Sequence, residues 1–296
     1  MQDFTNKLAV ITGGASGVGR SLAFALGAEG ARVLIADVDQ AALSSTVADL
    51  AEQGIEAHSQ VCDVTSADSV NQLAAKAYDE LGGAHLIFAN AGVAAGEAGP
   101  IWGYADNDWK WCFDVNFWGV VNTINAFMPR LVTQEAEDGA EAHIMITGSG
   151  NGAFLVYPDQ PVYSATKAAV QAVTEALYQQ MQAAGSKVKV HALFPGPHVV
   201  ETGIFDSDRV RPEHFAKAAD APDSGIRNAD DLRELMESYG AELHTTHPDE
   251  VAQTALQGIR DGQFWVVEWN DQTRDKVETR MQSILNKTNP VPAVLG

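Results

Sequence analysis

The chain has 296 residues, of which 46% are hydrophobic and 20% are charged, so it is long enough for one large globular domain with a buried core. Its 39 acidic and 19 basic side chains give a formal net charge of -20, which repels nucleic acid and anionic membranes and argues against both as partners. The two cysteines, Cys62 and Cys112, form no CxxC pair or zinc-binding cluster, and the first residues lack the apolar core of a secretory signal, so we expect a soluble cytoplasmic protein.

Seven short apolar runs, most of them rich in β-branched residues, predict β-strands. They lie at residues 7–12, 32–37, 56–64, 84–90, 142–148, 187–194 and 263–268. Between them, apolar residues recur every three or four positions, a pattern typical of helices that bury one face. Apolar strands that alternate with such helices indicate a parallel sheet covered on both faces. The sequence therefore predicts an α/β fold, a Rossmann-like doubly wound sheet of about seven parallel strands flanked by helices, in a single domain over residues 1–296.

A glycine-rich turn, TGGASGVG at residues 12–19, follows the first predicted strand. Its spaced glycines permit positive φ angles and close approach of a phosphate where the strand turns into a helix. The backbone amides at the start of that helix favour an anionic pyrophosphate. An ordinary βα turn is the alternative, but the position after the first strand favours dinucleotide binding. The cofactor contacts expected from this turn are Gly13, Ser16, Gly17, Val18 and Gly19.

Polar residues at three further strand ends extend this cofactor site. Asp37 ends the second predicted strand, where a carboxylate accepts hydrogen bonds from both ribose hydroxyls and repels a 2′-phosphate, so NAD is favoured over NADP. Asp63 ends the third and is placed to accept from the adenine amino group, and Asn90 begins an NAG motif after the fourth. The contacts expected here are Asp37, Val38, Asp63, Val64, Asn90, Ala91 and Gly92.

The segment from Pro195 to about His247 breaks the alternation of strands and helices. It is rich in Pro, Gly, Asp and Arg and shows no clear strand, before a helix that Pro248 opens and that places His247 at its N-terminus. Connections of this length in a compact domain are usually functional or mobile. We expect residues 197–247 to form a partly helical substrate lid.

The order of TGGASGVG, NAG, VYSATK and PG resembles that of the short-chain dehydrogenase/reductase family, in its compact single-domain form, over about residues 5–205 and 248–268. The resemblance implies a catalytic tetrad of Asn116, Ser149, Tyr163 and Lys167, in which the main chain of the asparagine helps to hold a water beside the lysine. It also implies a homodimer or homotetramer. Tyr163 and Lys167 then also contact the cofactor, together with Pro195, Gly196, Val199 and Thr202 after the PG turn.

The chemistry of Tyr163 and Lys167 supports this resemblance independently. Hydride transfer at a carbinol carbon needs a group that moves the hydroxyl proton. A free phenol has a pKa near ~10, and a nearby ammonium lowers it toward neutrality. Residues four apart on a helix share a face, so Lys167 lies beside Tyr163. An amphipathic first turn of a helix remains the structural alternative for this spacing.

Ser149 is expected to donate to the substrate oxygen and hold it near Tyr163. The interval from residue 149 to residue 163 is 14 positions, one more than the commonest spacing in the family. We expect the loop before the helix to absorb the extra residue. Tyr157 and Tyr178 lack a lysine four residues on and are interpreted as packing or rim residues, whereas His198 is a candidate for the pocket lining.

Aromatic residues predict an apolar pocket, although core and subunit-interface roles are the alternatives for some of them. They are Trp102, Tyr104, Trp109, Trp111, Phe113 and Trp118, together with Phe154, Phe205 and Phe215. The long lid and the stretch 232–285 also resemble dehydrogenases that oxidise benzylic alcohols of lignin-derived aryl ethers. A bulky or aromatic alcohol, or its ketone, is the expected substrate.

These observations predict an NAD-dependent oxidoreductase that transfers hydride between a hydrophobic secondary alcohol and nicotinamide, with Tyr163 as the acid-base and no metal. Three alternatives stay open: an NADPH-dependent ketone reductase, a non-catalytic NAD-binding sensor and a structural or interaction module. The intact Tyr163 and Lys167 pair argues against the sensor.

Overall fold

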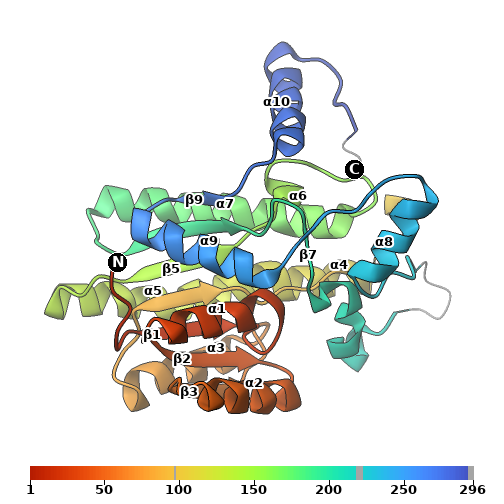
Figure 1. Ribbon diagram of the computed structural model, residues 1–296. Helices are drawn as coiled ribbons and strands as arrows, with labels where there is room; N and C mark the ends of the chain where they lie inside the picture. The colour runs from red at the N-terminus through yellow and green to blue at the C-terminus, as the bar shows by residue number, and fades with distance from the viewer. Residues whose placement is uncertain (97, 218–222, 293–296) are drawn as a thin grey trace.

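The structure is a computed structural model that describes residues 1–96, 98–217 and 223–292. At its centre lies a seven-stranded sheet in the order β3-β2-β1-β4-β5-β6-β9, with every neighbouring pair parallel (Figure 1). The strands are β1 (Leu8–Thr12), β2 (Arg32–Asp37), β3 (Ala57–Val61), β4 (Leu86–Ala89), β5 (His143–Thr147), β6 (Lys189–Phe194) and β9 (Trp265–Val267). Each lies within one of the seven predicted runs, so the predicted fold class is confirmed.

Two layers of helices cover the sheet (Figure 1). One layer contains α1 (Gly17–Ala28), α2 (Gln40–Glu52) and α9 (Pro248–Asp261). The other contains α3 (Ala67–Ala75), α5 (Gly119–Asp138) and α7 (Pro161–Ala184). In β1, Ala9 and Ile11 belong to the buried cluster under the first layer, while Leu8 and Val10 belong to the cluster under the second. Burial on both faces explains why the central strands are apolar without interruption.

The predicted helix at Pro248 is confirmed as α9. His247 is its N-cap, and its Nδ1 accepts a hydrogen bond from the backbone N–H of Asp249 at 3.3 Å. In return, the carboxylate of Glu250 accepts from the backbone N–H of His247 at 3.0 Å. This reciprocal capping, with proline in the first turn, fixes the start of the helix.

A π-helical turn joins α4 (Asp106–Phe113) to α5 at Asp114–Trp118. A second π-helical turn, Lys76–Glu80, extends α3. Such turns insert an extra residue into a helix and are frequent at functional sites. The turn at Asp114–Trp118 places Asn116 in the interior, with no exposed surface.

The predicted lid segment, residues 197–247, carries short elements outside the two helical layers. They are β7 (Val199–Val200), the 3₁₀ helices η4 (Gly203–Val210) and η5 (Glu213–Phe215), α8 (Ala229–Ser238) and β8 (Thr245–Thr246). The sequence shows no clear strand here, but β7 pairs with β8 in parallel and joins the two ends of the segment. Two residues are too few to produce a strand pattern in a sequence.

The remaining elements are the 3₁₀ helix η2 (Ile101–Gly103) and the helices α6 (Gly150–Ala153) and α10 (Asp271–Asn286). Figure 1 shows α8 and α10 projecting from the body formed by the sheet and its layers. Within residues 1–96, 98–217 and 223–292, no helix has the length and apolar character needed to span a bilayer.

Candidate active site and cofactor cleft

A cavity of about 520 Å³ opens at the carboxyl ends of the strands and collects most of the predicted site residues. In a doubly wound sheet this edge is where ligands bind. The predicted residues that line it are Gly13, Ser16, Gly17, Val18, Asp37, Val38, Asp63, Val64, Asn90, Ala91, Gly92, Ser149, Tyr163, Lys167, Pro195, Val199 and Thr202. Gly19, Asn116 and Gly196 are not among the lining residues.

The glycine turn leaves room that a side chain would fill. Gly13 has φ = 64°, and a Cβ atom there would lie 2.9 Å from the Cα of Ala91. Gly19 stands behind the cavity wall, where a Cβ atom would lie 2.1 Å from the carbonyl oxygen of Gly13. The first glycine supplies a left-handed conformation and the second a close approach between helix and turn. Gly17 and Val18 at the start of α1 line the cavity, so the residues of this turn are compatible with a bound dinucleotide.

Asn90 holds the glycine turn against two other strands. Its Nδ2 donates to the carbonyl oxygen of Thr12 at 3.1 Å, and its Oδ1 accepts from the hydroxyl of Thr147 at 3.1 Å. Asn90 therefore joins the ends of β1, β4 and β5 as well as lining the cavity, a structural role that the sequence motif did not reveal.

Two carboxylates stand at the end of the cavity nearest the glycine turn. Asp37 accepts from the backbone N–H groups of Ala15 at 3.3 Å and Asp39 at 3.2 Å, which fixes it at the end of β2. Asp63 accepts from the backbone N–H of Thr65 at 2.9 Å. Both charges raise the pKa of the neighbouring Cys62 thiol, although burial is the larger cause. Any further negative group placed at this end of the cavity, such as a phosphate, is repelled by these two carboxylates.

Tyr163 and Lys167 lie together on the first turns of α7. Lys167 is 3% exposed, and its Nζ donates to the carbonyl oxygen of Thr147 at 2.9 Å. The same Nζ lies 5.7 Å from the centre of the Tyr163 ring. Burial lowers the pKa of Lys167 to about 8, so the group is still mainly an ammonium at neutral pH. Both side chains line the cavity, as the spacing of four residues predicts.

Ser149 lies two residues after the end of β5 and caps α6, where its Oγ accepts from the backbone N–H of Asn151 at 3.2 Å. The Asn151 side chain crosses to α7, accepts from the hydroxyl of Ser164 at 2.6 Å and donates to Gln160 Oε1 at 2.9 Å. These bonds fix the longer loop at both ends. Ser149 and Tyr163 line the same cavity despite the extra residue.

Asn116 lies behind the cavity wall. Its Oδ1 accepts from the backbone N–H of Val93 at 2.8 Å, and its Nδ2 donates to the carbonyl oxygen of Val93 at 2.9 Å and the hydroxyl of Thr166 at 3.0 Å. The amide is therefore occupied in joining the loop after β4 to α7. Because these bonds occupy the side chain, only the main chain of Asn116 is available for the predicted proton path.

The turn after β6 meets the glycine turn. Thr202 caps η4, and a Cβ atom on Gly17 would lie 3.0 Å from the Thr202 methyl group. Val199 and Pro195 line the cavity beside it, and so does His198. The predicted segment after the PG motif is thus placed against the cofactor cleft.

Comparison with known proteins places the chain in a family. The model for short chain dehydrogenases matches residues 7–211. The chain belongs to the short-chain dehydrogenase/reductase family. Its relatives are named oxidoreductases and dehydrogenases, and it is itself an oxidoreductase that acts on CH–OH groups with a nicotinamide cofactor.

Individual relatives align with most of the length of this dehydrogenase. A short-chain dehydrogenase/reductase from Burkholderia phymatum, solved in complex with NAD, superposes with a TM-score of 0.87 at 33% identity and matches 100% of both chains. The C alpha-dehydrogenase of Sphingobium sp. SYK-6 is 29% identical over 98% of this chain and 89% of its own. The 1-deoxy-11-beta-hydroxypentalenate dehydrogenase of Streptomyces exfoliatus is 36% identical over 64% of this chain and 66% of its own.

The prediction of an aromatic pocket in this dehydrogenase is only partly right. Trp111, Phe205 and Phe215 line the cavity. Trp102 is 86% exposed and Trp118 is 51% exposed, because each lies at the surface of its turn. The others predicted for the pocket do not line it either: Tyr104, Trp109, Phe113 and Phe154. Phe154 packs instead on Phe194, Trp265 and Trp269 at the β9 end of the sheet.

Several lining residues of this dehydrogenase were missed from the sequence. Asn151 and Gln160 come from the loop between Ser149 and Tyr163, and Tyr157 in the same loop also lines the cavity, as its interpretation as a rim residue allows. Further lining residues come from α8 and α10: Leu232, Met236, Asn270, Gln272, Thr273 and Lys276. The amphipathic pattern of α8 was the available signal, but its partner could not be predicted. Tyr178 packs on Phe264, as expected of a packing residue. No metal-binding group of three or more His, Cys, Asp or Glu side chains occurs among the described residues.

Proposed function

We propose that this enzyme oxidises bulky or aromatic secondary alcohols to ketones with NAD, or catalyses the reverse reaction, and that Tyr163 is its acid-base. The observation that carries the proposal is the meeting of Tyr163, Lys167 and Ser149 in one cavity with the glycine turn and Asp37. The Burkholderia relative binds NAD, and two other relatives are named dehydrogenases, which supports the same assignment.

The cavity has apolar walls that support a hydrophobic substrate. Its walls carry many apolar side chains, and such walls with a few polar groups are typical of small-molecule sites. The apolar side chains that line the cavity include Val93, Trp111, Leu155, Ile204, Phe205, Phe215, Leu232 and Met236. Ser149 and Tyr163 are the hydroxyl groups that we assign to the substrate oxygen.

In the oxidation, bound NAD supplies the acceptor for the hydride that leaves the carbinol carbon. The Ser149 hydroxyl donates a hydrogen bond to the substrate oxygen and orients it. The phenolate oxygen of Tyr163 receives the proton of the alcohol as the carbon–oxygen double bond forms, and it returns that proton when a ketone is reduced. The ammonium of Lys167 stabilises the phenolate and holds a ribose hydroxyl of the cofactor. Asn116 completes the proton path through its main chain.

The remaining assignments stay predictions. We expect a homodimer or homotetramer in the cytoplasm, and a lid formed by residues 197–247. The cofactor contacts that the sequence predicted, which include Gly196 and Gly19 outside the cavity lining, are part of this proposal.

A panel of secondary alcohols tests the function. With NAD, 1-phenylethanol and larger benzylic alcohols are expected to give NADH and the matching ketone at higher kcat/KM than 2-butanol, because the apolar walls reward a larger apolar substrate. The rates follow from NADH absorbance, and chromatography identifies the ketone. NADH binding without turnover of any alcohol would support the sensor alternative instead.

The NAD preference is predicted to depend on Asp37. In the double variant Asp37→Ser/Val38→Arg, the ratio of kcat/KM for NAD to that for NADP should fall by about 100-fold or more, because the carboxylate that repels a 2′-phosphate is removed and a cation is added beside it. Val38 is 45% exposed and lines the cavity, so an arginine can extend there. Initial rates with each cofactor measure the ratio.

Asp39→Ser is the matched control for this experiment. Asp39 lies two residues further on and caps α2 by accepting from two backbone N–H groups at 3.0 Å, a role that serine retains. Asp39 does not line the cavity, so its loss should leave the cofactor ratio nearly unchanged. An equal shift in both variants would mean that net charge, and not the position of Asp37, sets the preference.

A further inference from the structure

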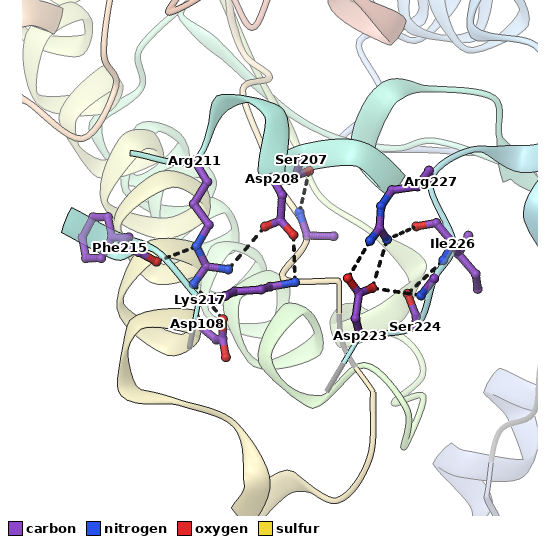
Figure 2. Close-up of polar contacts among 12 residues, drawn as sticks. Asp108, Ser207, Asp208, Arg211, Phe215, Lys217, Asp223, Ser224, Ile226 and Arg227 are labelled. Atoms are coloured by element: carbon purple, nitrogen blue, oxygen red, sulfur yellow. Dashed lines mark hydrogen bonds and ion pairs between the residues drawn. The ribbon is translucent and has the colours of Figure 1, made fainter. Parts of the chain in front are cut away.

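A buried ion pair that the proposed mechanism does not use joins the predicted lid to α4 (Figure 2). Arg211 directly follows η4, and its side chain is 4% exposed, while that of Asp108 on α4 is 7% exposed. One guanidinium nitrogen of Arg211 donates to Asp108 Oδ1 at 2.7 Å, and Nε donates to the carbonyl oxygen of Phe215 at 2.7 Å. A further nitrogen donates to Asp208 Oδ1 at 3.3 Å. Arg211 therefore binds η4, η5 and α4 together.

The same guanidinium supports a wall of the cavity from behind. Its Cζ lies 4.7 Å from the ring centre of Trp111, which is 2% exposed. Trp111 and Phe215 both line the cavity, and Arg211 does not. Arg211 thus contacts the Trp111 ring and the Phe215 backbone without lining the cavity itself.

Asp108 fixes the other side of the contact. Its second oxygen, Oδ2, accepts from the backbone N–H of Ala105 at 3.2 Å, at the start of α4. A buried charge is tolerated only when it is well paired, so Asp108 and Arg211 strongly favour the one arrangement in which they meet. A planar guanidinium that forms directed hydrogen bonds and stacks on an indole is not replaced by a lysine.

We propose that Arg211 is a positioning residue for the substrate: through Asp108 it holds residues 203–217 and the Trp111 wall at the spacing that a bulky alcohol requires. The substrate class in this inference rests on the proposed function. The role of the ion pair in holding residues 203–217 does not.

The lid offers a matched control pair, also drawn in Figure 2. Arg227 and Asp223 form an ion pair at 2.5 Å, four residues apart, with side chains that are 42% and 40% exposed. Neither residue lines the cavity. This pair lies in the same lid, but it is solvated and local, and exposed pairs of this kind contribute little to stability.

The kinetic test compares Arg211→Met and Asp108→Asn with Arg227→Met. For the first two variants, KM for 1-phenylethanol should rise by about tenfold or more, so kcat/KM for this alcohol should fall more than kcat/KM for 2-butanol. The affinity for NADH should stay within about twofold of the wild-type value. Arg227→Met should change none of these values. Arg211→Lys, which keeps the charge, replaces Arg211→Met if the latter does not fold, and it should show the same selectivity change to a smaller degree.

Hydrogen exchange provides a readout that needs no turnover. Amides of residues 203–217 should lose protection in Arg211→Met and Asp108→Asn but not in Arg227→Met, while the central strands stay protected. If the wild type oxidises no alcohol, the proposed function fails, and this exchange result alone decides whether the ion pair holds the segment. Unchanged alcohol selectivity in a folded variant overturns the positioning role, and so does an equal loss for both alcohols. Unchanged protection overturns the ion pair as the element that fixes the segment.

Discussion

Tyr163→Phe is expected to lower kcat for alcohol oxidation by about 10²–10⁴-fold, which is the usual range for the loss of a positioned acid-base. The variant removes only the phenol oxygen, so the ring that packs at the start of α7 is retained. Lys167 and the glycine turn are unaffected, and the dissociation constant of NADH should stay within about twofold of the wild-type value. Steady-state rates and NADH fluorescence titration measure the two quantities.

Tyr157→Phe is the control for that experiment. Tyr157 lines the same cavity and also carries a phenol, but burial raises its pKa, so even less of it is phenolate at neutral pH than for a free tyrosine. Its replacement should change kcat by less than about threefold, because no proton transfer depends on it. If Tyr157→Phe abolished turnover and Tyr163→Phe did not, the acid-base would be assigned to the wrong phenol.

Lys167→Met is expected to remove most of the activity and yet to stabilise the fold. Activity falls because the phenolate loses its ammonium and the cofactor loses a hydrogen-bond donor. Stability rises because the wild type buries a charge whose pKa is lowered to about 8. We expect a gain of about 1–3 kcal/mol in the free energy of unfolding at pH 7, after the lost hydrogen bond to Thr147 is deducted. Thermal or urea unfolding measures it.

The gain in stability from Lys167→Met should depend on pH. Below about pH 8, Lys167 is protonated in both the folded and the unfolded chain, and the full cost of burying its charge is present. Between about pH 8 and about pH 10.4 the folded chain loses this proton first, so wild-type stability rises relative to the variant. The advantage of Lys167→Met should therefore be largest below pH 8 and shrink above it.

Lys76→Met separates this effect from the general loss of a lysine. The ammonium of Lys76 also donates to a backbone carbonyl oxygen, that of Ser59 at 3.1 Å, but at a half-buried position. Its replacement should give no gain in stability, since little burial of charge is relieved. A similar gain in both variants would indicate that net charge, and not the burial of Lys167, limits the stability of the fold.

The sheet could be predicted from the sequence because its strands carry the signal themselves. In β1, residues on both faces are buried, so the run at residues 8–12 is apolar and differs clearly from its flanks. The strands β7 and β8 gave no such pattern, because each has only two residues and pairs with a segment 46 residues away in the sequence. The π-helical turn at Asp114–Trp118 has no recognisable period in the sequence either.

The candidate site also has parts that a local sequence pattern predicts and parts that it does not. The glycine turn and the interval from Tyr163 to Lys167 are local, so spacing and chemistry predict their positions in the cavity. The contact between Asp108 and Arg211 joins residues 103 positions apart, and no local pattern pairs them. The prediction that the aromatic residues line the pocket was partly wrong for the same reason. Whether Trp111 or Trp102 faces the cavity depends on which segment of the chain packs beside it.

Deuterium transfer tests the central claim most directly. The fastest alcohol of the panel, labelled with deuterium at its carbinol carbon, is incubated with NAD and the wild-type enzyme, and the NADH and ketone formed are analysed by mass spectrometry and NMR. We expect one deuterium at C4 of the nicotinamide for each molecule of ketone. NADH without deuterium, or no NADH with any alcohol of the panel, would contradict it.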